Sequence, residues 1–126
     1  MTEAIRVFVC ARAANRCEYC QLHQDDSPLA ALHIEHIRPR KHGGADDASN
    51  LCLACIGCNL HKGSNLTGID PLTGAVTELF HAREQRWEDH FAWAGIRLVG
   101  KTPVGRTTIQ VLDMNSEEQL DLRTVG

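Results

Sequence analysis

Two Cys-x-x-Cys pairs, Cys17/Cys20 and Cys55/Cys58, constrain what this 126-residue chain can fold into more than any other feature. Four thiolates in two such pairs suit a structural zinc ion in tetrahedral coordination. The chain is long enough for a real core, but it lies in the size range where a bound metal helps to stabilise the fold. We therefore expect one compact domain, or a small motif with an extension, built around a zinc site.

The six cysteines leave other chemistry open. They could form three disulfides, or the two pairs could act as redox dithiols. The sequence shows no secretion signal, so metal binding is favoured over disulfides. Cys10 lies in an apolar stretch and is expected to be a small buried residue without a ligand role. Cys52 adjoins the second pair and is expected to face away from it, also unliganded.

A second set of polar residues lies between and beside the cysteines, namely Glu35, His36, Asn50 and Asn59. A structural zinc site does not need them. A carboxylate, an imidazole and carboxamides suit a harder divalent cation and a general base. The alternative is that Glu35-His36 is a solvated strand end, Asn50 a turn residue and Asn59 a helix N-cap.

Periodicity predicts the elements that carry these residues. Apolar residues at helical spacing predict a helix over 2–14. Residues 31–37 and 51–53 are expected as two short strands, followed by a helical turn over 56–62 that Gly63 ends. This order predicts an α+β fold in which zinc pins a β-hairpin and a helix at their base.

The second half of the chain predicts a turn, two strands and two helices. These lie at 70–74, at 75–80 and 96–100, and at 83–91 and from Thr102-Pro103 onward. The last ten residues are polar, and we expect them to end the domain loosely. We divide the chain into a core of residues 1–66 and an extension of residues 67–126 that packs on it.

The net charge of −3 gives no global sign of nucleic-acid binding, so any basic face must be local. Arg38, Arg40 and Lys41, with Lys62, are the candidates for this face. Lys62, Arg38 and Arg40 are the candidates for phosphate contacts, and ordinary solvated charges are the alternative. No apolar run approaches membrane-spanning length. We expect a cytoplasmic protein that does not contact a membrane.

Together these residues form a string that resembles the HNH endonuclease family: Arg16-Cys-x-x-Cys … Glu35-His … His42-Gly-Gly … Asn50-Leu … Cys55-x-x-Cys-Asn59. The resemblance is to members whose ββα-metal (His-Me finger) motif is braced by a four-cysteine zinc site. The segment from Asp70-Pro-Leu-Thr-Gly to Thr102-Pro-x-Gly-Arg106 is similar to the C-terminal extension of one bacterial subgroup. In that subgroup the corresponding helix usually starts with Asn-Pro-Arg, whereas this chain has His81-Ala82-Arg83 at that place.

The resemblance implies metal-dependent hydrolysis of phosphodiester bonds in DNA. His36 would be the general base, and Asn50 would hold the loop and the base in position. Glu35, where the family usually has Asp, and Asn59 would bind the catalytic cation. The cysteines Cys17, Cys20, Cys55 and Cys58 would bind zinc. Oxygen ligands predict Mg²⁺ or Mn²⁺ at the catalytic site, unless His33 or His61 joins the shell.

Two other function classes stay open. A zinc-braced module whose catalytic site has decayed would bind nucleic acid without cleaving it. A thiol-based redox or zinc-sensing protein would leave the polar set unexplained. Nothing in the motif reads a 2′-hydroxyl, so RNA is also a possible substrate. Specificity, nicking against double-strand cleavage, and oligomeric state are not encoded in any motif of the chain.

Overall fold

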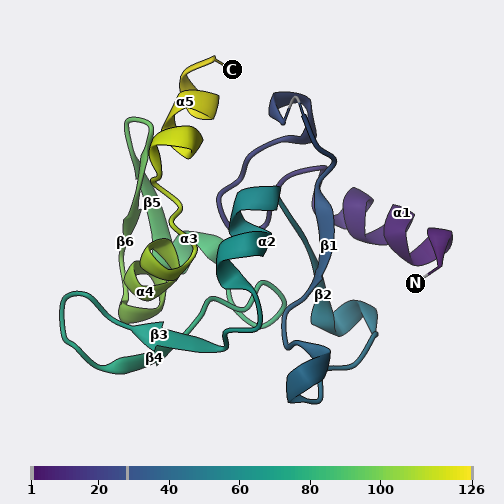
Figure 1. The fold of residues 1–126 in the computed structure, drawn as a ribbon, viewed down its shortest axis with the longest axis horizontal. Coiled ribbons are helices and arrows are strands. Elements are labelled where there is room, and N and C mark those ends of the chain that lie inside the picture. The colour runs from purple at the N-terminus through teal and green to yellow at the C-terminus, as the bar shows by residue number, and fades with distance from the viewer. Residues whose placement is uncertain (1, 28, 126) are drawn as a thin grey trace.

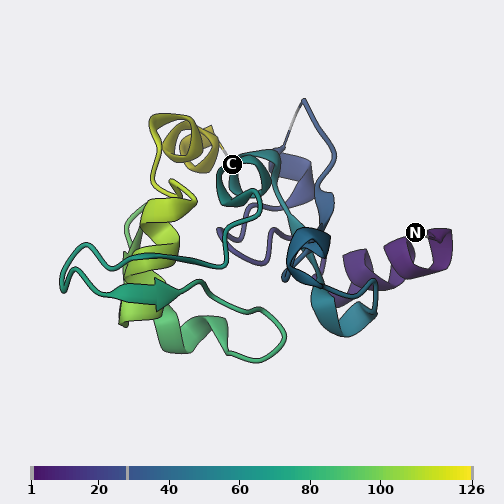
Figure 2. The ribbon, with the colours of Figure 1, turned by 60° about the horizontal axis from the view of Figure 1, so that its bottom comes forward.

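The computed structural model describes residues 2–27 and 29–125, and it shows helices and small antiparallel strand pairs, an α+β fold. Two groups of elements lie side by side (Figure 1). Helix α1 (Glu3–Arg12) and the β1–β2 hairpin form one group, and everything from β3 to α5 forms the other. Helix α2 (Ile56–Lys62) lies between them, as the turned view also shows (Figure 2).

Helix α1 begins at an N-cap, Thr2, whose hydroxyl accepts a hydrogen bond from the Ile5 amide at 3.2 Å. Its buried residue, Val9, packs in the core, as the helical spacing predicts. At its C-terminal end, Arg12 donates to the Leu51 carbonyl oxygen at 2.7 Å, which ties the helix to β2. Cys10 is half-buried rather than buried.

The predicted hairpin and helix are confirmed. Strand β1 (His33–His36) pairs with β2 (Leu51–Ala54) in an antiparallel register that sets His36 opposite Leu51. β1 is shorter than the expected 31–37. Every residue of β2 is buried, so this strand is covered on both faces. Helix α2 follows directly and ends at Gly63, whose φ of 51° suits a glycine C-cap.

The C-terminal group contains two further hairpins and three helices. Strands β3 and β4 flank a turn at Asp70, and β3 was not predicted from the sequence. The bounds are β3 (Thr67–Ile69), β4 (Val76–Glu78), α3 (Trp87–His90), β5 (Phe91–Ala94), β6 (Arg97–Gly100), α4 (Pro103–Val111) and α5 (Glu117–Val125). Helix α4 begins at the predicted place, because Thr102 caps it and Pro103 occupies its first turn.

The predicted helix over 83–91 is wrong. Only the single turn α3 is helical, and Phe91 begins strand β5, where it pairs with Gly100. The Trp87 and Phe91 rings do stack, with centroids 5.2 Å apart. Before α3, the His81 ring accepts hydrogen bonds from the Arg83 and Glu84 amides. Such local side-chain bonds hold a turn instead of a helix.

The expectation of a loose C-terminus is also wrong, because residues 117–125 form α5. Ser116 caps this helix, accepting the Gln119 amide hydrogen at 3.2 Å on its hydroxyl. Ser116 and Gln119 have the spacing of a capping box, a signal visible in the sequence that the polarity of the segment obscured. Gln119 itself is buried.

Contacts between the two groups surround the first cysteine pair. The Trp87 indole donates to the Tyr19 carbonyl oxygen at 2.7 Å, and Arg83 forms an ion pair with Glu18. The Tyr19 and Phe80 rings meet edge to face, with centroids 6.4 Å apart. The C-terminal elements therefore hold the segment that carries Cys17 and Cys20. In the described part of the chain, no helix has both the length and the apolar character to cross a bilayer.

Candidate metal centre and active site

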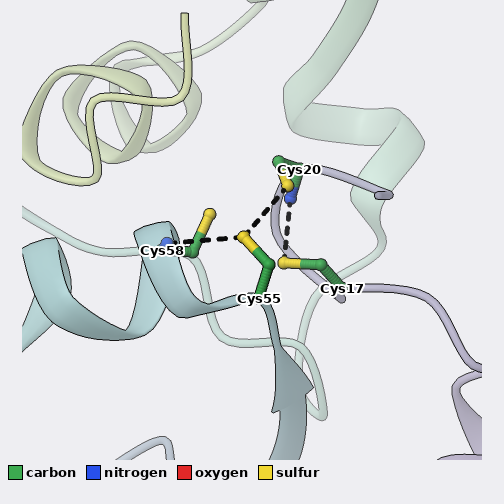
Figure 3. A group of neighbouring side chains, drawn as sticks. All are labelled: Cys17, Cys20, Cys55 and Cys58. Atoms are coloured by element: carbon green, nitrogen blue, oxygen red, sulfur yellow. Dashed lines mark hydrogen bonds between the residues drawn. The ribbon is translucent and has the colours of Figure 1, made fainter. Parts of the chain in front are cut away.

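The four paired cysteines come together at the start of α2 (Figure 3). Cys17 and Cys20 belong to the turn after α1, whereas Cys55 and Cys58 lie at the N-terminus of α2. All four Sγ atoms lie within 4.8 Å of one another, and those of Cys20 and Cys55 are 3.6 Å apart. Zinc–sulfur bonds of about 2.3 Å place tetrahedral sulfurs roughly 3.8 Å apart. The cluster therefore suits a structural zinc ion.

Backbone and side-chain donors support the cluster. The Cys20 amide lies 3.4 Å from Cys17 Sγ, and the Cys58 amide lies 3.4 Å from Cys55 Sγ. Gln119, from the far end of the chain, also donates to Cys55 Sγ at 3.4 Å. Burial raises the pKa of the Cys17 thiol, so a bound cation would have to displace its proton. Among residues 2–27 and 29–125, no other group of three His, Cys, Asp or Glu side chains gathers in this way.

His36 stands at the last position of β1, where the strand ends before Pro39. Its Nε2 lies 2.7 Å from Asp46 Oδ1, and its side chain is 19% exposed. Arg40 donates from Nε to the same carboxylate oxygen at 2.9 Å. These hydrogen bonds, first that of His36 and then that of Arg40, lower the pKa of Asp46. The imidazole is thus accessible at one edge and held by an ionised carboxylate at the other.

Asn50 fastens the loop between the two strands. Its carboxamide oxygen accepts the Arg38 amide hydrogen at 2.8 Å, and its nitrogen donates to the Arg38 and Ala45 carbonyl oxygens at 3.0 and 2.8 Å. Gly44 runs so close to this brace that a Cβ there would lie 1.7 Å from the Arg38 carbonyl oxygen. The side chain therefore fixes both ends of the loop that carries Asp46.

Glu35 points to the opposite face of β1 and is 6% exposed. Its Oε2 accepts a hydrogen bond from the Tyr19 hydroxyl at 2.8 Å and lies 3.3 Å from Cys52 Sγ. Burial raises the pKa of Tyr19 and of Cys52, so both keep their protons and can donate to the carboxylate. Cys52 lies inside the core and is not one of the four clustered cysteines.

Comparison with known proteins identifies the segment that contains these residues. Residues 17–65 match the family model described as HNH endonuclease. Residues 17–65 are thus similar to HNH endonuclease domains, and we refer to them below as the HNH domain. Among curated proteins and among solved structures, nothing matches the chain. The match spans both cysteine pairs and the whole polar set of the HNH domain.

The predicted role of Lys62, in the last turn of the HNH domain's helix α2, is wrong. A phosphate contact was expected, but Lys62 is 1% exposed, and its ammonium is turned inward. Its Nζ donates to the Ile37 carbonyl oxygen at 3.0 Å and forms an ion pair with Glu35 Oε1 at 2.9 Å. The last turn of α2 buries this side chain against β1, where the Glu35 carboxylate is the charge that balances it.

The remaining predicted residues of the HNH domain lie on α2 and at the start of β1. Asn59, one helical turn before Lys62, is half-buried, and within the described residues its carboxamide forms no hydrogen bond. His61 binds the Gly57 carbonyl oxygen of its own helix at 2.9 Å and lies 4.0 Å from Asp113. His33 is exposed at the start of β1.

Arg38 and Arg40 are exposed on the loop after His36. Arg38 lines a cavity of about 430 Å³ between the HNH domain and the extension. The other lining residues are Ile37, Lys62, Asn65, Leu66, Glu78, Leu79, Phe80, His81, Glu84 and Gln85. Arginine and glutamate side chains thus face the same cavity, so its charge is mixed.

Sequence reasoning missed three residues around the site: Tyr19, Asp46 and Gln119. Asp46 lies in a loop whose residues are typical of turns, and only its distance to His36 distinguishes it from Asp47. Tyr19 lies between Cys17 and Cys20, so the sequence placed it near the cysteine cluster but did not show which way its side chain points. Gln119 had the capping-box spacing alone.

Proposed function

We propose that the HNH domain is a metal-dependent endonuclease that hydrolyses phosphodiester bonds in DNA, with His36 as the general base. The supporting observation is the position of His36 at an accessible strand end with one ring nitrogen held by Asp46. Within the described residues, the other ring nitrogen, Nδ1, forms no hydrogen bond and has a lone pair for a proton from water. Asn50 keeps the loop, and with it the imidazole, in place.

We propose further that Glu35 and Asn59 hold the catalytic cation, with Mg²⁺ or Mn²⁺ preferred. The donors are a carboxylate and a carboxamide, which are the ligand types that hard cations favour. Glu35 Oε1 already has a cation, the Lys62 ammonium, 2.9 Å away. A bound divalent ion would offset negative charge on the phosphate. It would have to compete with Lys62 for this oxygen.

The structural zinc ion belongs to the four cysteines, which hold the first turn of α2 against the segment after α1. Contacts to substrate phosphates are proposed for Arg38 and Arg40, which are exposed beside His36. Arg40 can form such contacts while it binds Asp46, since its side chain is 66% exposed. Lys62 is buried and is not proposed to contact phosphate.

Cleavage of supercoiled plasmid tests the function. With Mg²⁺ or Mn²⁺ we expect nicked or linear product, which disappears with a chelator that leaves the cysteine-bound zinc in place, and with His36→Ala. His23→Ala is the matched control, because His23 caps a short turn by accepting the Asp25 amide hydrogen and is not one of the proposed site residues. Binding of DNA without cleavage by the wild-type protein would refute the enzyme and support the inactive zinc-braced binding module.

A further inference from the structure

The predictions from the sequence assigned no role to Asp46, the carboxylate beside His36. Asp46 Oδ1 lies 2.7 Å from His36 Nε2 and 2.9 Å from Arg40 Nε. We propose that Asp46 is a positioning residue that holds neutral His36 in the tautomer with its proton on Nε2, so that Nδ1 is the atom that accepts a proton from water. This inference rests on the proposed function, because it assigns the working atom of the proposed base.

The tautomer follows from the chemistry of the pair. Two donors, His36 and Arg40, lower the pKa of Asp46, so at neutral pH this carboxylate is ionised and only accepts hydrogen bonds. A distance of 2.7 Å then requires that Nε2 carry the hydrogen. In a neutral imidazole only one ring nitrogen is protonated, so Nδ1 is left with its lone pair.

The loop is built to keep Asp46 at this distance. Asn50 binds the carbonyl oxygen of Ala45, the residue directly before Asp46. Gly44 allows the backbone to pass the Arg38 carbonyl oxygen, a path that any Cβ would block. Because the Asp46 side chain is 65% exposed, a pair with His36 alone would contribute little. The Arg40 contact and the braced backbone already restrict the Asp46 side chain. Asp46 therefore loses little conformational entropy when it pairs with His36.

The proton balance of the step is simple. A water O–H bond breaks as its proton passes to His36 Nδ1, the water oxygen bonds to phosphorus, and the P–O bond to the leaving oxygen breaks. The leaving oxygen takes a proton from solvent, and His36 later returns its own proton to solvent. Asp46 stays ionised throughout and faces the imidazolium that forms, which its negative charge stabilises.

The test compares Asp46→Asn with Asp47→Asn, an exposed neighbour that removes the same charge and whose side chain caps no helix. Long-range ¹⁵N–¹H NMR on the zinc-loaded full chain reports the His36 tautomer without any need for activity. Wild type and Asp47→Asn should show the Nε2–H form. Asp46→Asn should shift His36 toward a mixture or toward Nδ1–H, because the amide can also donate to Nε2.

In plasmid cleavage, Asp46→Asn should lower kcat by about ten- to a hundredfold and leave KM within about twofold. This loss is smaller than the ~10⁴-fold seen for a buried triad aspartate, because Asp46 is exposed. A wild-type Nδ1–H tautomer, or an Asp46→Asn variant that matches Asp47→Asn in both tautomer and kcat, overturns the inference. An Nε2–H tautomer in a protein that does not cleave DNA would refute the proposed function and leave the positioning contact standing.

Discussion

The buried pair of Glu35 and Lys62 makes a prediction about stability that does not depend on the enzymatic role. Both side chains are nearly inaccessible, with 6% and 2% exposure. Replacing Lys62 with methionine keeps the length of the side chain and removes its charge. The Glu35 carboxylate would then stay buried with only the Tyr19 hydroxyl and the Cys52 thiol as donors.

The size of the effect follows from the geometry. At a separation of 2.9 Å and an effective dielectric constant of about 20, the attraction is about 6 kcal/mol. Much of this offsets the cost of burying both groups, and the removal of one partner from such a pair costs about 3–5 kcal/mol. The Ile37 carbonyl oxygen also loses its hydrogen bond from Nζ. We therefore expect Lys62→Met to lower the free energy of unfolding by about 3–5 kcal/mol.

Urea unfolding at fixed zinc concentration, followed by tryptophan fluorescence, measures this change. Lys41→Met is the matched control, since Lys41 is exposed and is in no ion pair of the described residues; it should shift the free energy by less than about 0.5 kcal/mol. The double variant Lys62→Met with Glu35→Gln also removes the Glu35 charge that would otherwise be buried without a partner. It should recover at least half of the loss.

Two results would refute this reasoning. One is a Lys62→Met variant that unfolds within about 1 kcal/mol of Lys41→Met, which would mean that the ammonium does not balance a buried charge. The other is a double variant no more stable than Lys62→Met alone, which would mean that the loss comes from packing rather than from the unpaired carboxylate.

Three further predictions concern the cysteine cluster, the β3–β4 turn and the loop brace. Cys58→Ser should lose its bound zinc by elemental analysis and unfold at lower temperature, whereas half-buried Cys10→Ser should keep one zinc per chain; equal zinc content in both would contradict the cluster. Arg106 donates to both Asp70 oxygens and lowers the pKa of Asp70, so this carboxylate adds stability fully above the unfolded pKa of about 4 and loses it as the pH falls further. The difference in urea midpoint between wild type and Asp70→Asn should thus be constant from pH 7 to 5 and shrink below pH 4. A difference that grows at lower pH would contradict a stabilising Asp70 carboxylate. Gly44→Ala forces the loop away from the Arg38 carbonyl oxygen and should reduce plasmid cleavage at least tenfold without loss of zinc, whereas exposed Ser49→Ala should cleave like wild type.

The hairpin, helix α2 and the cysteine cluster could be predicted because their signals are local. Each Cys-x-x-Cys pair makes its own turn, and a helix that starts at Cys55 and ends before Gly63 has both of its boundaries in the sequence. Asn50 was likewise readable as a loop brace from its place in the motif. Its hydrogen bonds to Arg38 and Ala45 agree with that expectation, while its role in catalysis stays a prediction.

The failures come from long-range contacts that override local preference. Trp87 and Phe91 have helical spacing, but Phe91 pairs with Gly100, and close approach of the chain at Gly105 to the His90 carbonyl oxygen fixes that arrangement. The sequence predicts an exposed Lys62 that contacts phosphate or solvent, and nothing near it in the sequence shows that it lies against Glu35. The partner of a buried charge is chosen by the packing of α2 on β1, which periodicity does not describe.

The hydrogen bond from Gln119 to Cys55 Sγ joins the last helix of the chain to one of the metal-binding sulfurs. A donor on a thiolate withdraws electron density from sulfur and makes it a poorer nucleophile toward oxidants and alkylating agents. On a ribosome this protection would be missing until α5 had emerged, because the four cysteines are synthesised long before it. The protection of Cys55 Sγ therefore depends on the packing of α5 after the four cysteines have been synthesised.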